Sequence, residues 1–386
     1  MTITVRAITT QAHDQWVSSQ PFVSFLQLPR WGAVKVGWQA QSIGWFSDSQ
    51  MVAAALVLYR PIPKVPSRTL AYLPEGPALP WADASMTEIN QWLDPLIAHC
   101  RAAGAFMIKM GPPIALARWH AATIKDAIAA REDAPDPSAL PRRLSQVPPD
   151  WSSEHAAATV RSLQAAGWTQ QASEGAGFGD VQPRYVFQVP LEGRTPEQVL
   201  AGFNQLWRRN VRKAEKAGVL VRIGTRTDLD AFHPIYVETA KRDGFTPRGL
   251  SYFQRMWDCL NQDTDGRPGT LALYLAEFDG HVAAATLMVR VGQHAWYSYG
   301  ASTTADRDVR PSNALQWQMM QDAMAAGCTV YDLRGITDTV DSADHLFGLV
   351  QFKVGTGGYA QEYVGEWDYV LRPMWARAYR TWQARH

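Results

Sequence analysis

The stretch Ala276–Arg290, AEFDGHVAAATLMVR, has a counterpart near the other end of the chain, where residues 44–60 read GWFSDSQMVAAALVLYR. Both copies contain an aromatic residue, a short polar turn, the tetrapeptide Val-Ala-Ala-Ala and an apolar run that ends in Arg. A second pair follows in the same order, because residues 102–104 and 325–327 both read Ala-Ala-Gly and both precede another apolar run. Signals repeated in one order predict one domain fold used twice. The alternative is chance recurrence of Ala-rich runs.

Length and composition fit two globular domains. The chain has 386 residues, 46% hydrophobic and 19% charged, with a net charge of +1, and two domains of roughly 150–200 residues are the natural division. No apolar run approaches the roughly 18–20 residues of a membrane span, and the first residues lack the order of a secretory signal. We therefore expect a cytoplasmic protein that meets anionic partners through local basic patches.

The cysteines and histidines do not suggest a disulfide framework or a metal site. The three cysteines are far apart with no CxxC pair, and the nine histidines show no metal-ligand spacing. Such a pattern is typical of a protein in a reducing compartment. We expect no metal.

Alternating helices and strands, with hairpins around Asp48 and Asp279, predict an α/β (α+β) fold with one mixed sheet per domain. We place the first domain at residues 1–183 and the second at 184–365, with a boundary at 150 as the alternative. A helix over about 366–386 is expected to complete the first domain.

Three segments lead to specific predictions. One long helix is expected over 196–217, and a second over 85–102. Residues 131–151 are rich in proline and charge and are interpreted as a long surface loop.

The segment 207–216, WRRNVRKAEK, is the most basic part of the chain. On a helix, Arg208, Arg209, Arg212 and Lys216 share one face. Such a stripe suits a phosphate backbone, which it would bind with an affinity that depends on salt. The alternative is an ordinary solvated helix face.

Residues 245–252, FTPRGLSY, combine a turn with the start of a helix. The guanidinium of Arg248, the hydroxyl of Thr246 and the phenol of Tyr252 could converge there on one anion, and Arg suits phosphate because its planar fork donates two hydrogen bonds. An ordinary surface turn is the alternative.

Two lysines lie beside aromatic residues. Phe352 and Lys353 end an apolar stretch just before a glycine-rich segment, a place where a cation can stabilise a developing oxyanion. Lys35 lies between Trp31 and Trp38, where it could equally extend along the edge of a core.

The four nearby acids Asp332, Asp338, Asp341 and Asp344 lack calcium-loop spacing. We interpret them as solvated loop carboxylates.

The predicted sheet is similar to the acetyltransferase fold of the GNAT superfamily. Enzymes of that type that use coenzyme A need a glycine-rich turn at a helix start to hold the pyrophosphate. The corresponding segment here, residues 307–315, reads RDVRPSNAL and has no glycine, and residues 76–80, GPALP, are no better suited. We expect no coenzyme A and no other cofactor.

The chain resembles the Fem family of non-ribosomal peptidyl transferases. The resemblance is carried by SFLQLPRWGAVKVGW, AYLPEGPAL, RRNVRKAEKAGV, ETAKRDGFTPRGLSYF, YSYGAS, YDLRGI and FGLVQFKVGTGGYAQEYVGEWD, which extend from about residue 24 to 368. It implies two tandem GNAT-like domains and transfer of an amino acid (Gly, Ala or Ser) from aminoacyl-tRNA to a peptidoglycan precursor. The precursor is either UDP-MurNAc-pentapeptide or lipid II.

The resemblance also implies roles for individual residues. Lys353 is the expected catalytic lysine for the oxyanion, with Phe352 facing the tRNA acceptor end. The remaining candidates would bind the muramyl-peptide precursor: Lys35, Trp38, Thr246, Arg248, Tyr252 and Tyr299, with Tyr297 as the alternative to the last. Two departures stand out, because Gly111 takes the place of a common family Asp and no coiled-coil arm is present.

From these observations we expect aminoacyl transfer by a monomer, without metal or cofactor. A lipid-linked acceptor would bring the protein to the inner face of the membrane. Two other classes of protein are the alternatives: an N-acyltransferase that uses acyl-CoA, and a non-enzymatic RNA-binding protein that uses the basic helix.

Overall fold

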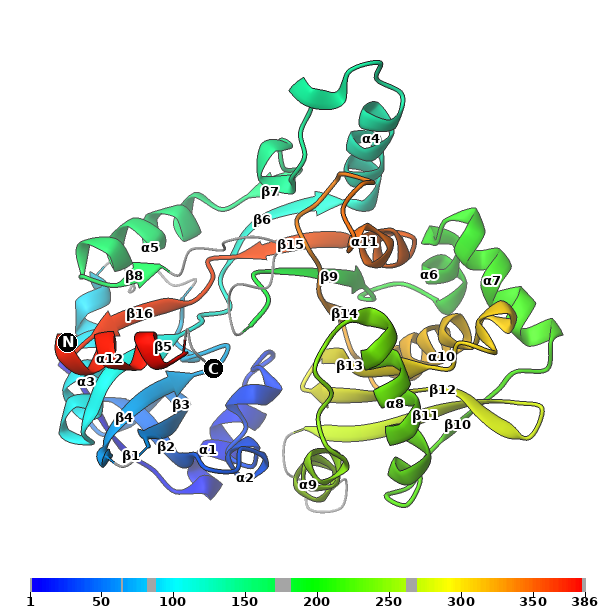
Figure 1. The fold of residues 1–386 in the computed structure, drawn as a ribbon. Coiled ribbons are helices and arrows are strands. Elements are labelled where there is room, and N and C mark those ends of the chain that lie inside the picture. The colour runs from blue at the N-terminus through cyan, green and yellow to red at the C-terminus, as the bar shows by residue number, and fades with distance from the viewer. Residues whose placement is uncertain (1, 64, 82–87, 171–181, 262–268, 384–386) are drawn as a thin grey trace. The chain divides into compact units, whose positions relative to one another are not determined.

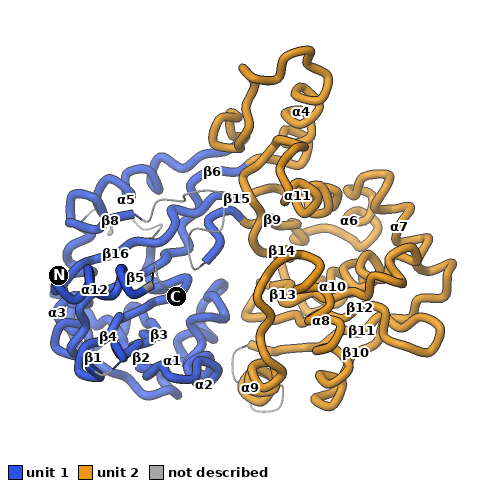
Figure 2. Tube along the Cα trace, in the orientation of Figure 1, with its two compact units in different colours: residues 1–118, 151–185, 361–386 blue, residues 119–150, 186–360 orange. Residues whose placement is uncertain are grey.

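The computed structural model describes residues 2–63, 65–81, 88–170, 182–261 and 269–383 (Figure 1). They form two compact units, shown in Figure 2. Unit 1 comprises residues 1–118, 151–185 and 361–386, and unit 2 comprises 119–150 and 186–360.

Unit 1 is a mixed sheet with helices packed on it. Its strands follow the order β1-β2-β3-β4-β5-β16-β8. The elements are β1 (Ile3–Ala7), α1 (Thr10–Ser18), α2 (Trp31–Val34), β2 (Gln39–Ser47), β3 (Gln50–Ile62), β4 (Val65–Leu73), α3 (Ile89–Ala102), β5 (Ala105–Met110), β7 (Trp151–Ser152), α5 (Glu154–Ala165), β8 (Thr169–Gln170), β16 (Trp367–Val370) and α12 (Pro373–Gln383).

Unit 2 is built in the same way, and its sheet contains the order β10-β11-β12-β13-β14-β9. The chain passes between the units inside β6 (Ala115–His120), β9 (Tyr185–Pro190) and β15 (Tyr359–Tyr363), and also directly before β7. The remaining elements are α4 (Ala121–Glu132), α6 (Pro196–Gly202), α7 (Gln205–Lys216), β10 (Leu220–Ile223), α8 (Leu229–Asp243), α9 (Leu250–Leu260), β11 (Thr270–Phe278), β12 (His281–Val291), β13 (His294–Ser302), α10 (Pro311–Ala325), β14 (Val330–Gly335) and α11 (Phe347–Val354).

The predicted internal repeat is confirmed by the topology. In unit 1, β4 and β5 are parallel and are joined through α3; in unit 2, β13 and β14 are parallel and are joined through α10. The hairpins β2–β3 and β11–β12 carry the two Val-Ala-Ala-Ala copies. The two Ala-Ala-Gly copies end α3 and α10, where Gly104 and Gly327 adopt φ of +84° and +78°. Only glycine adopts that left-handed conformation without strain, which explains why both copies keep it.

The alanines of the repeat lie where both faces of a sheet are covered. Residues 53–55 and 283–285 are all fully buried, although successive strand residues point to opposite faces. In unit 2, α8 and α10 both pack on β12. Small side chains let helices approach the central strand closely, so the sequence shows an apolar run rather than an alternating pattern.

The expected long helix over 196–217 is wrong, because the structure has two helices there. α6 ends at Gly202, and Asn204 then begins α7 by accepting a hydrogen bond at 2.8 Å from the backbone N–H of Trp207. Asparagine is a favoured N-cap, and its side chain competes with a continuous helix. The start of the expected helix over 85–102 lies outside the described residues, and its remainder is α3.

Residues 131–151, interpreted from the sequence as a surface loop, contain short 3-10 turns at Pro137–Ala139 and Leu144–Gln146. The turns follow α4, which ends at Glu132, and residues 119–150 group with unit 2. The C-terminal helix α12 packs within unit 1, where Ala376 and Tyr379 belong to one apolar cluster with Leu70, Phe106 and Met107.

Candidate active site

Lys353 lies on α11 with its ammonium group buried. Its Nζ donates hydrogen bonds to the carbonyl oxygen of Gly335 at 2.6 Å and to that of Arg334 at 3.4 Å. Only 4% of the residue is exposed. Burial lowers the pKa of Lys353 to about 7; the nearby Arg334 charge acts in the same direction and Asp332 acts against it. The lysine therefore changes its charge close to neutral pH.

The carbonyl groups that hold Lys353 lie where two parallel strands stop pairing. β13 and β14 are paired only from His294↔Val330 to Trp296↔Asp332. Farther along, Arg334 adopts φ of +62° and Tyr299 adopts φ of +53°. A non-glycine residue at positive φ is uncommon, and such strained residues concentrate at functional sites.

Tyr299 forms a phenol pair with Tyr252 at the start of α9. The two hydroxyl oxygens are 2.8 Å apart, and the Arg248 guanidinium lies 5.4 Å from the Tyr252 ring centre. Burial raises the pKa of both phenols, while the charge of Arg248 opposes the shift in each. Both hydroxyls are therefore neutral hydrogen-bonding groups beside a cation.

Thr246 and Arg248 lie in the exposed segment between α8 and α9. The structure places the Tyr252 hydroxyl beside that of Tyr299 and the Arg248 guanidinium near the Tyr252 ring. The alternative residue Tyr297 is half-buried, and its hydroxyl lies beside Gly300.

Phe352 connects Lys353 with the basic helix α7. The Trp207 indole N–H donates to the Phe352 carbonyl at 2.7 Å, and the two ring centres are 4.8 Å apart. The Asn204 backbone N–H also donates to the Gly355 carbonyl at 2.9 Å. The beginning of α7 is therefore fixed on the end of α11.

The basic stripe of α7 is only partly available to a ligand. Arg209, Arg212 and Lys216 are exposed. Arg208 instead donates through one nitrogen to the backbone carbonyls of Ala201 (at 3.0 Å) and Phe203. Its side chain therefore caps the end of α6. The sequence pattern did not predict this capping role.

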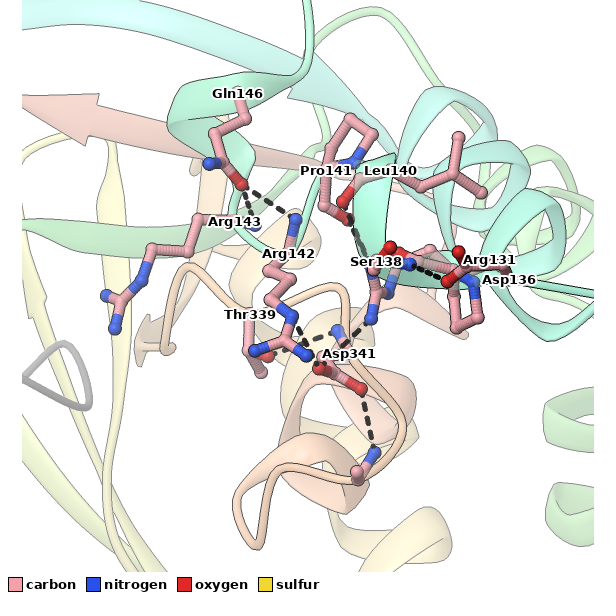
Figure 3. A network of polar contacts seen from close by, with 12 residues as sticks. Arg131, Asp136, Ser138, Leu140, Pro141, Arg142, Arg143, Gln146, Thr339 and Asp341 are labelled. Atoms are coloured by element: carbon pink, nitrogen blue, oxygen red, sulfur yellow. Dashed lines mark hydrogen bonds and ion pairs between the residues drawn. The ribbon is translucent and has the colours of Figure 1, made fainter. Parts of the chain in front are cut away.

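A polar network fixes the segment between β14 and α11 (Figure 3). Arg131 at the end of α4 and Arg142 both reach the Asp341 carboxylate, at 3.1 and 3.6 Å. Arg143 pairs with Asp338 at 3.1 Å. The segment 131–143 thus holds a loop that lies about 200 residues farther along the chain.

The expectation of solvated loop carboxylates is wrong for three of the four acids, Asp332, Asp338 and Asp341. Asp332 and Asp338 are buried, and Asp338 and Asp341 are both ion-paired with arginines of the 131–143 segment. Their partners come from distant parts of the sequence, so the spacing of the acids did not reveal them.

Unit 1 contributes its own group of candidate residues. The Lys35 ammonium lies 5.2 Å from the Trp31 ring centre, and the Trp38 ring lies 6.2 Å from that of Tyr72. The Tyr72 hydroxyl in turn donates to Glu366 at 2.7 Å. Lys35 and Trp38 belong to unit 1, whereas the other candidates belong to unit 2.

Glu366 lies beside Gly111, the position at which the family resemblance would place an Asp. A Cβ at Gly111 would lie 3.3 Å from Glu366 Cγ and 3.7 Å from its Oε1. Glu366 is 2% exposed. A carboxylate from the residue just before β16 therefore occupies the space next to the glycine. In the sequence, a role for Glu366 is indicated by its position in VGEWD, part of one of the segments that carry the family resemblance.

The described residues contain no group of three or more His, Cys, Asp or Glu side chains placed to hold a metal ion. Within the same parts of the chain, no helix combines the length and apolar character that crossing a bilayer requires.

The fold defines the class of protein, two GNAT-like units in tandem. The second unit has a buried lysine at its strand divergence, the place where the parallel strands β13 and β14 stop pairing. A tandem GNAT protein from the clavulanic acid biosynthesis pathway has this fold, with 11% identity, a TM-score of 0.51 and coverage of 95% of this chain and 98% of that one. The FemX crystal structure is more similar, with a TM-score of 0.77, 24% identity and coverage of 97% and 99%.

The family model described as the FemAB family matches residues 8–265 and 273–383, and the chain belongs to this family. Among curated relatives, the lipid II:glycine glycyltransferase of Staphylococcus aureus (strain USA300) is 25% identical over 94% of this chain and 92% of the relative. That alignment spans 433 positions, more than the 386 residues of this chain, so the relative contains insertions that this chain lacks.

Proposed function

We propose that this protein is an aminoacyltransferase that adds an amino acid from aminoacyl-tRNA to the stem-peptide amine of a peptidoglycan precursor. The observation that carries the proposal is the buried Lys353 at the strand divergence of a FemAB-family chain. The name of the Staphylococcus aureus relative supports a peptidoglycan precursor such as lipid II as acceptor. UDP-MurNAc-pentapeptide is the soluble acceptor to be tested beside it.

The reaction requires orientation and charge stabilisation. The acceptor amine attacks the ester carbonyl of the aminoacyl-tRNA, and a C–N bond forms while negative charge develops on the carbonyl oxygen. An ammonium group has three N–H donors. Two of those of Lys353 are directed to Arg334 and Gly335, and we assign the third to the oxyanion. Collapse breaks the ester bond, and the proton lost by the amine leaves with the tRNA hydroxyl.

Binding of the two substrates is divided between the described groups. We assign the acceptor phosphates to Arg248 of unit 2, with Thr246, Tyr252 and Tyr299 of the same unit. Lys35 and Trp38 of unit 1 are separate candidates for contact with the precursor. We assign the tRNA phosphates to the exposed face of α7, with Arg209, Arg212 and Lys216, and the acceptor end to Phe352. The hydrogen bonds between α7 and the end of α11 support the assignment of tRNA to α7, because they fix the basic helix relative to Lys353.

The decisive experiment measures transfer of radiolabelled amino acids from a mixed pool of charged tRNAs. UDP-MurNAc-pentapeptide and lipid II in vesicles serve as separate acceptors. Labelled product would establish the reaction, identify the amino acid and distinguish a soluble from a membrane-bound acceptor. Folded protein that yields no product on either acceptor would contradict the proposal. Acyl-CoA donors and tRNA binding without transfer would then be measured to separate the two other classes.

Replacing Arg248 should weaken acceptor binding. We expect Arg248→Ala to raise the KM for the acceptor by roughly 10- to 100-fold, because a charge-assisted hydrogen bond contributes about 1.5–3 kcal/mol. The thermal stability should hardly change, since the side chain is exposed. Arg226→Ala is the control, because Arg226 pairs with Asp258 on the surface of the same unit. An unchanged acceptor KM would remove Arg248 from the site.

Removing charge from α7 should act on the other substrate. We expect Arg209→Gln/Arg212→Gln to raise the KM for aminoacyl-tRNA about tenfold. The slope of log K for tRNA binding against log salt concentration should become less steep by about 0.7–0.9 for each phosphate that the helix no longer neutralises. Arg161→Gln/Arg377→Gln, which removes two exposed helical arginines of unit 1, is the matched control. Equal salt slopes in the two double variants would show that α7 does not bind the tRNA.

A further inference from the structure

Asp332 is a buried acid that the proposed mechanism does not use. Only 2% of the residue is exposed, and it lies on β14 opposite Gln188 of β9. A buried carboxylate needs hydrogen-bond partners to remain charged. Asp332 has them on both oxygens, because Oδ1 accepts from the Arg334 backbone N–H at 2.6 Å and Oδ2 accepts from the Gln188 amide at 3.0 Å.

Further contacts make Asp332 the centre of a network. His294 Nε2 lies 3.4 Å from Oδ2, and the Tyr359 hydroxyl donates to the side-chain amide oxygen Oε1 of Gln188 at 3.1 Å. Burial by itself would raise the pKa of Asp332, but the bonds from His294 and Gln188 and the charge of Arg334 keep it below the usual value. Asp332 is therefore a carboxylate at any pH at which the enzyme would work.

The same carboxylate determines the conformation that holds Lys353. The sheet register shifts between Asp332 and Gly335, and Arg334 lies in that irregular turn at φ of +62°. A hydrogen bond from an Asp side chain to the backbone N–H two residues later is the usual way to stabilise such a turn. The turn directs the carbonyls of Arg334 and Gly335 at the lysine Nζ.

Asp332 also acts on Lys353 through its charge. It is the group that favours the protonated lysine, against burial and against Arg334. The charges of Arg334 and Asp332 on β14 act directly on Lys353. His294 on β13 contacts Asp332, and Tyr359 on β15 binds Gln188, so both influence Lys353 only indirectly. From α4, which packs on α11, Arg131 is directed to Asp341.

We infer that Asp332 is a positioning residue that acts through Lys353 in two ways. It holds the turn that directs the Arg334 and Gly335 carbonyls at Nζ, and it supplies the counter-charge of the ammonium group. The inference rests on the proposed function for its consequence in catalysis. Its structural part, the coupling between the two side chains, can be measured without any substrate.

The first test follows the ionisation of Lys353 by NMR in protein labelled with ¹³C at lysine Cε, with Lys353→Met to assign the signal. We expect Asp332→Asn to lower the titration midpoint of Lys353 by at least about one pH unit, as expected when a nearby opposite charge is removed. Asparagine keeps an oxygen acceptor for the Arg334 N–H. Asp344→Asn, in the segment between β14 and α11, should leave the midpoint unchanged. An unmoved midpoint in Asp332→Asn would overturn the inference.

The second test compares pH–rate profiles of transfer. Because the oxyanion needs a protonated lysine, we expect the descending limb of Asp332→Asn to move to lower pH by the same amount as the NMR midpoint. The ratio of wild-type to variant rate should then fall toward a few-fold at low pH. A ratio that is the same at every pH would indicate a merely structural role and would contradict the inference.

The two readouts separate the inference from the proposed function. A shifted NMR midpoint without transfer by the wild-type protein would refute the function and leave the coupling. Transfer by the wild-type protein without a shifted NMR midpoint would support the function and refute the coupling. Should Asp332→Asn fail to fold, the reciprocal measurement applies, because coupling between two sites is mutual. The ¹³Cγ titration of Asp332 should then move to higher pH in Lys353→Met, and an unmoved titration would refute the coupling.

Discussion

Lys353→Met should abolish most of the transfer activity while the protein stays folded. We expect kcat to fall by at least about 10²–10³-fold, the usual effect of removing one oxyanion donor, with KM values for both substrates within a few-fold of wild type. Methionine is unbranched, flexible and uncharged, so it can fill the buried space of the lysine stem without leaving a buried ammonium. Single-turnover rates with charged tRNA measure the effect.

The same variant should change how stability depends on pH. The folded-state pKa of Lys353, about 7, is below its usual 10.5, so between these values the unfolded chain binds a proton that the native protein does not. Stability rises with pH in that window. The stability of wild type relative to Lys353→Met should therefore increase by about 1.4 kcal/mol per pH unit from about pH 7 upward. Below pH 7 the difference should be constant.

Urea unfolding of both proteins at several pH values checks this result. Lys241→Met removes an exposed lysine of the same unit and should show the wild-type slope. Residual turnover above about a tenth of wild type would dismiss Lys353 as the oxyanion residue. A pH-independent stability difference would show that the lysine is not deprotonated in the native state near neutral pH.

Gly357→Ala should be strongly destabilising. Gly357 has φ of +74°, and a Cβ there would overlap the backbone carbonyl of Gly202 at the end of α6. The conformational penalty of an alanine at this left-handed φ is about 1–2 kcal/mol, and the overlap forces α6 away from the segment that follows α11. We expect a total loss of at least about 3 kcal/mol, measured by thermal or denaturant unfolding.

Gly348→Ala is the matched control within α11. A Cβ at Gly348 would meet nothing within 4 Å, so this substitution should stabilise the helix by about 0.5–1 kcal/mol. Similar stability changes in the two variants would mean that the close packing of α6 on the glycine-rich segment is not what holds this part of unit 2 together.

Much of the fold was predictable because its signals are local. The hairpin turns at Asp48 and Asp279, the alanine runs and the Ala-Ala-Gly helix ends each depend on a few consecutive residues. They were enough to predict two similar mixed sheets. The break at Asn204 could also have been found, since Asn is a favoured N-cap, but the helical periodicity on both sides concealed it.

The candidate site was predictable only in part. The family resemblance assigned six residues to precursor binding, and of these the structure places Tyr252 beside Tyr299 and the Arg248 guanidinium near the Tyr252 ring. Their role in binding stays a prediction. The sequence pattern suggested a solvated Asp332 and gave no reason to place Glu366 beside Gly111. In both cases the neighbouring residues are far away in the sequence.

The sequence by itself determined the repeated architecture, the positions of most helices and strands, and the residue types available for binding and catalysis. The tertiary structure alone decided which of those side chains are buried, and therefore which carry a shifted pKa. Lys353 and Asp332 show the reason: hydration and counter-charge depend on residues brought close by the fold, such as Gln188 and His294. Local sequence does not contain that information.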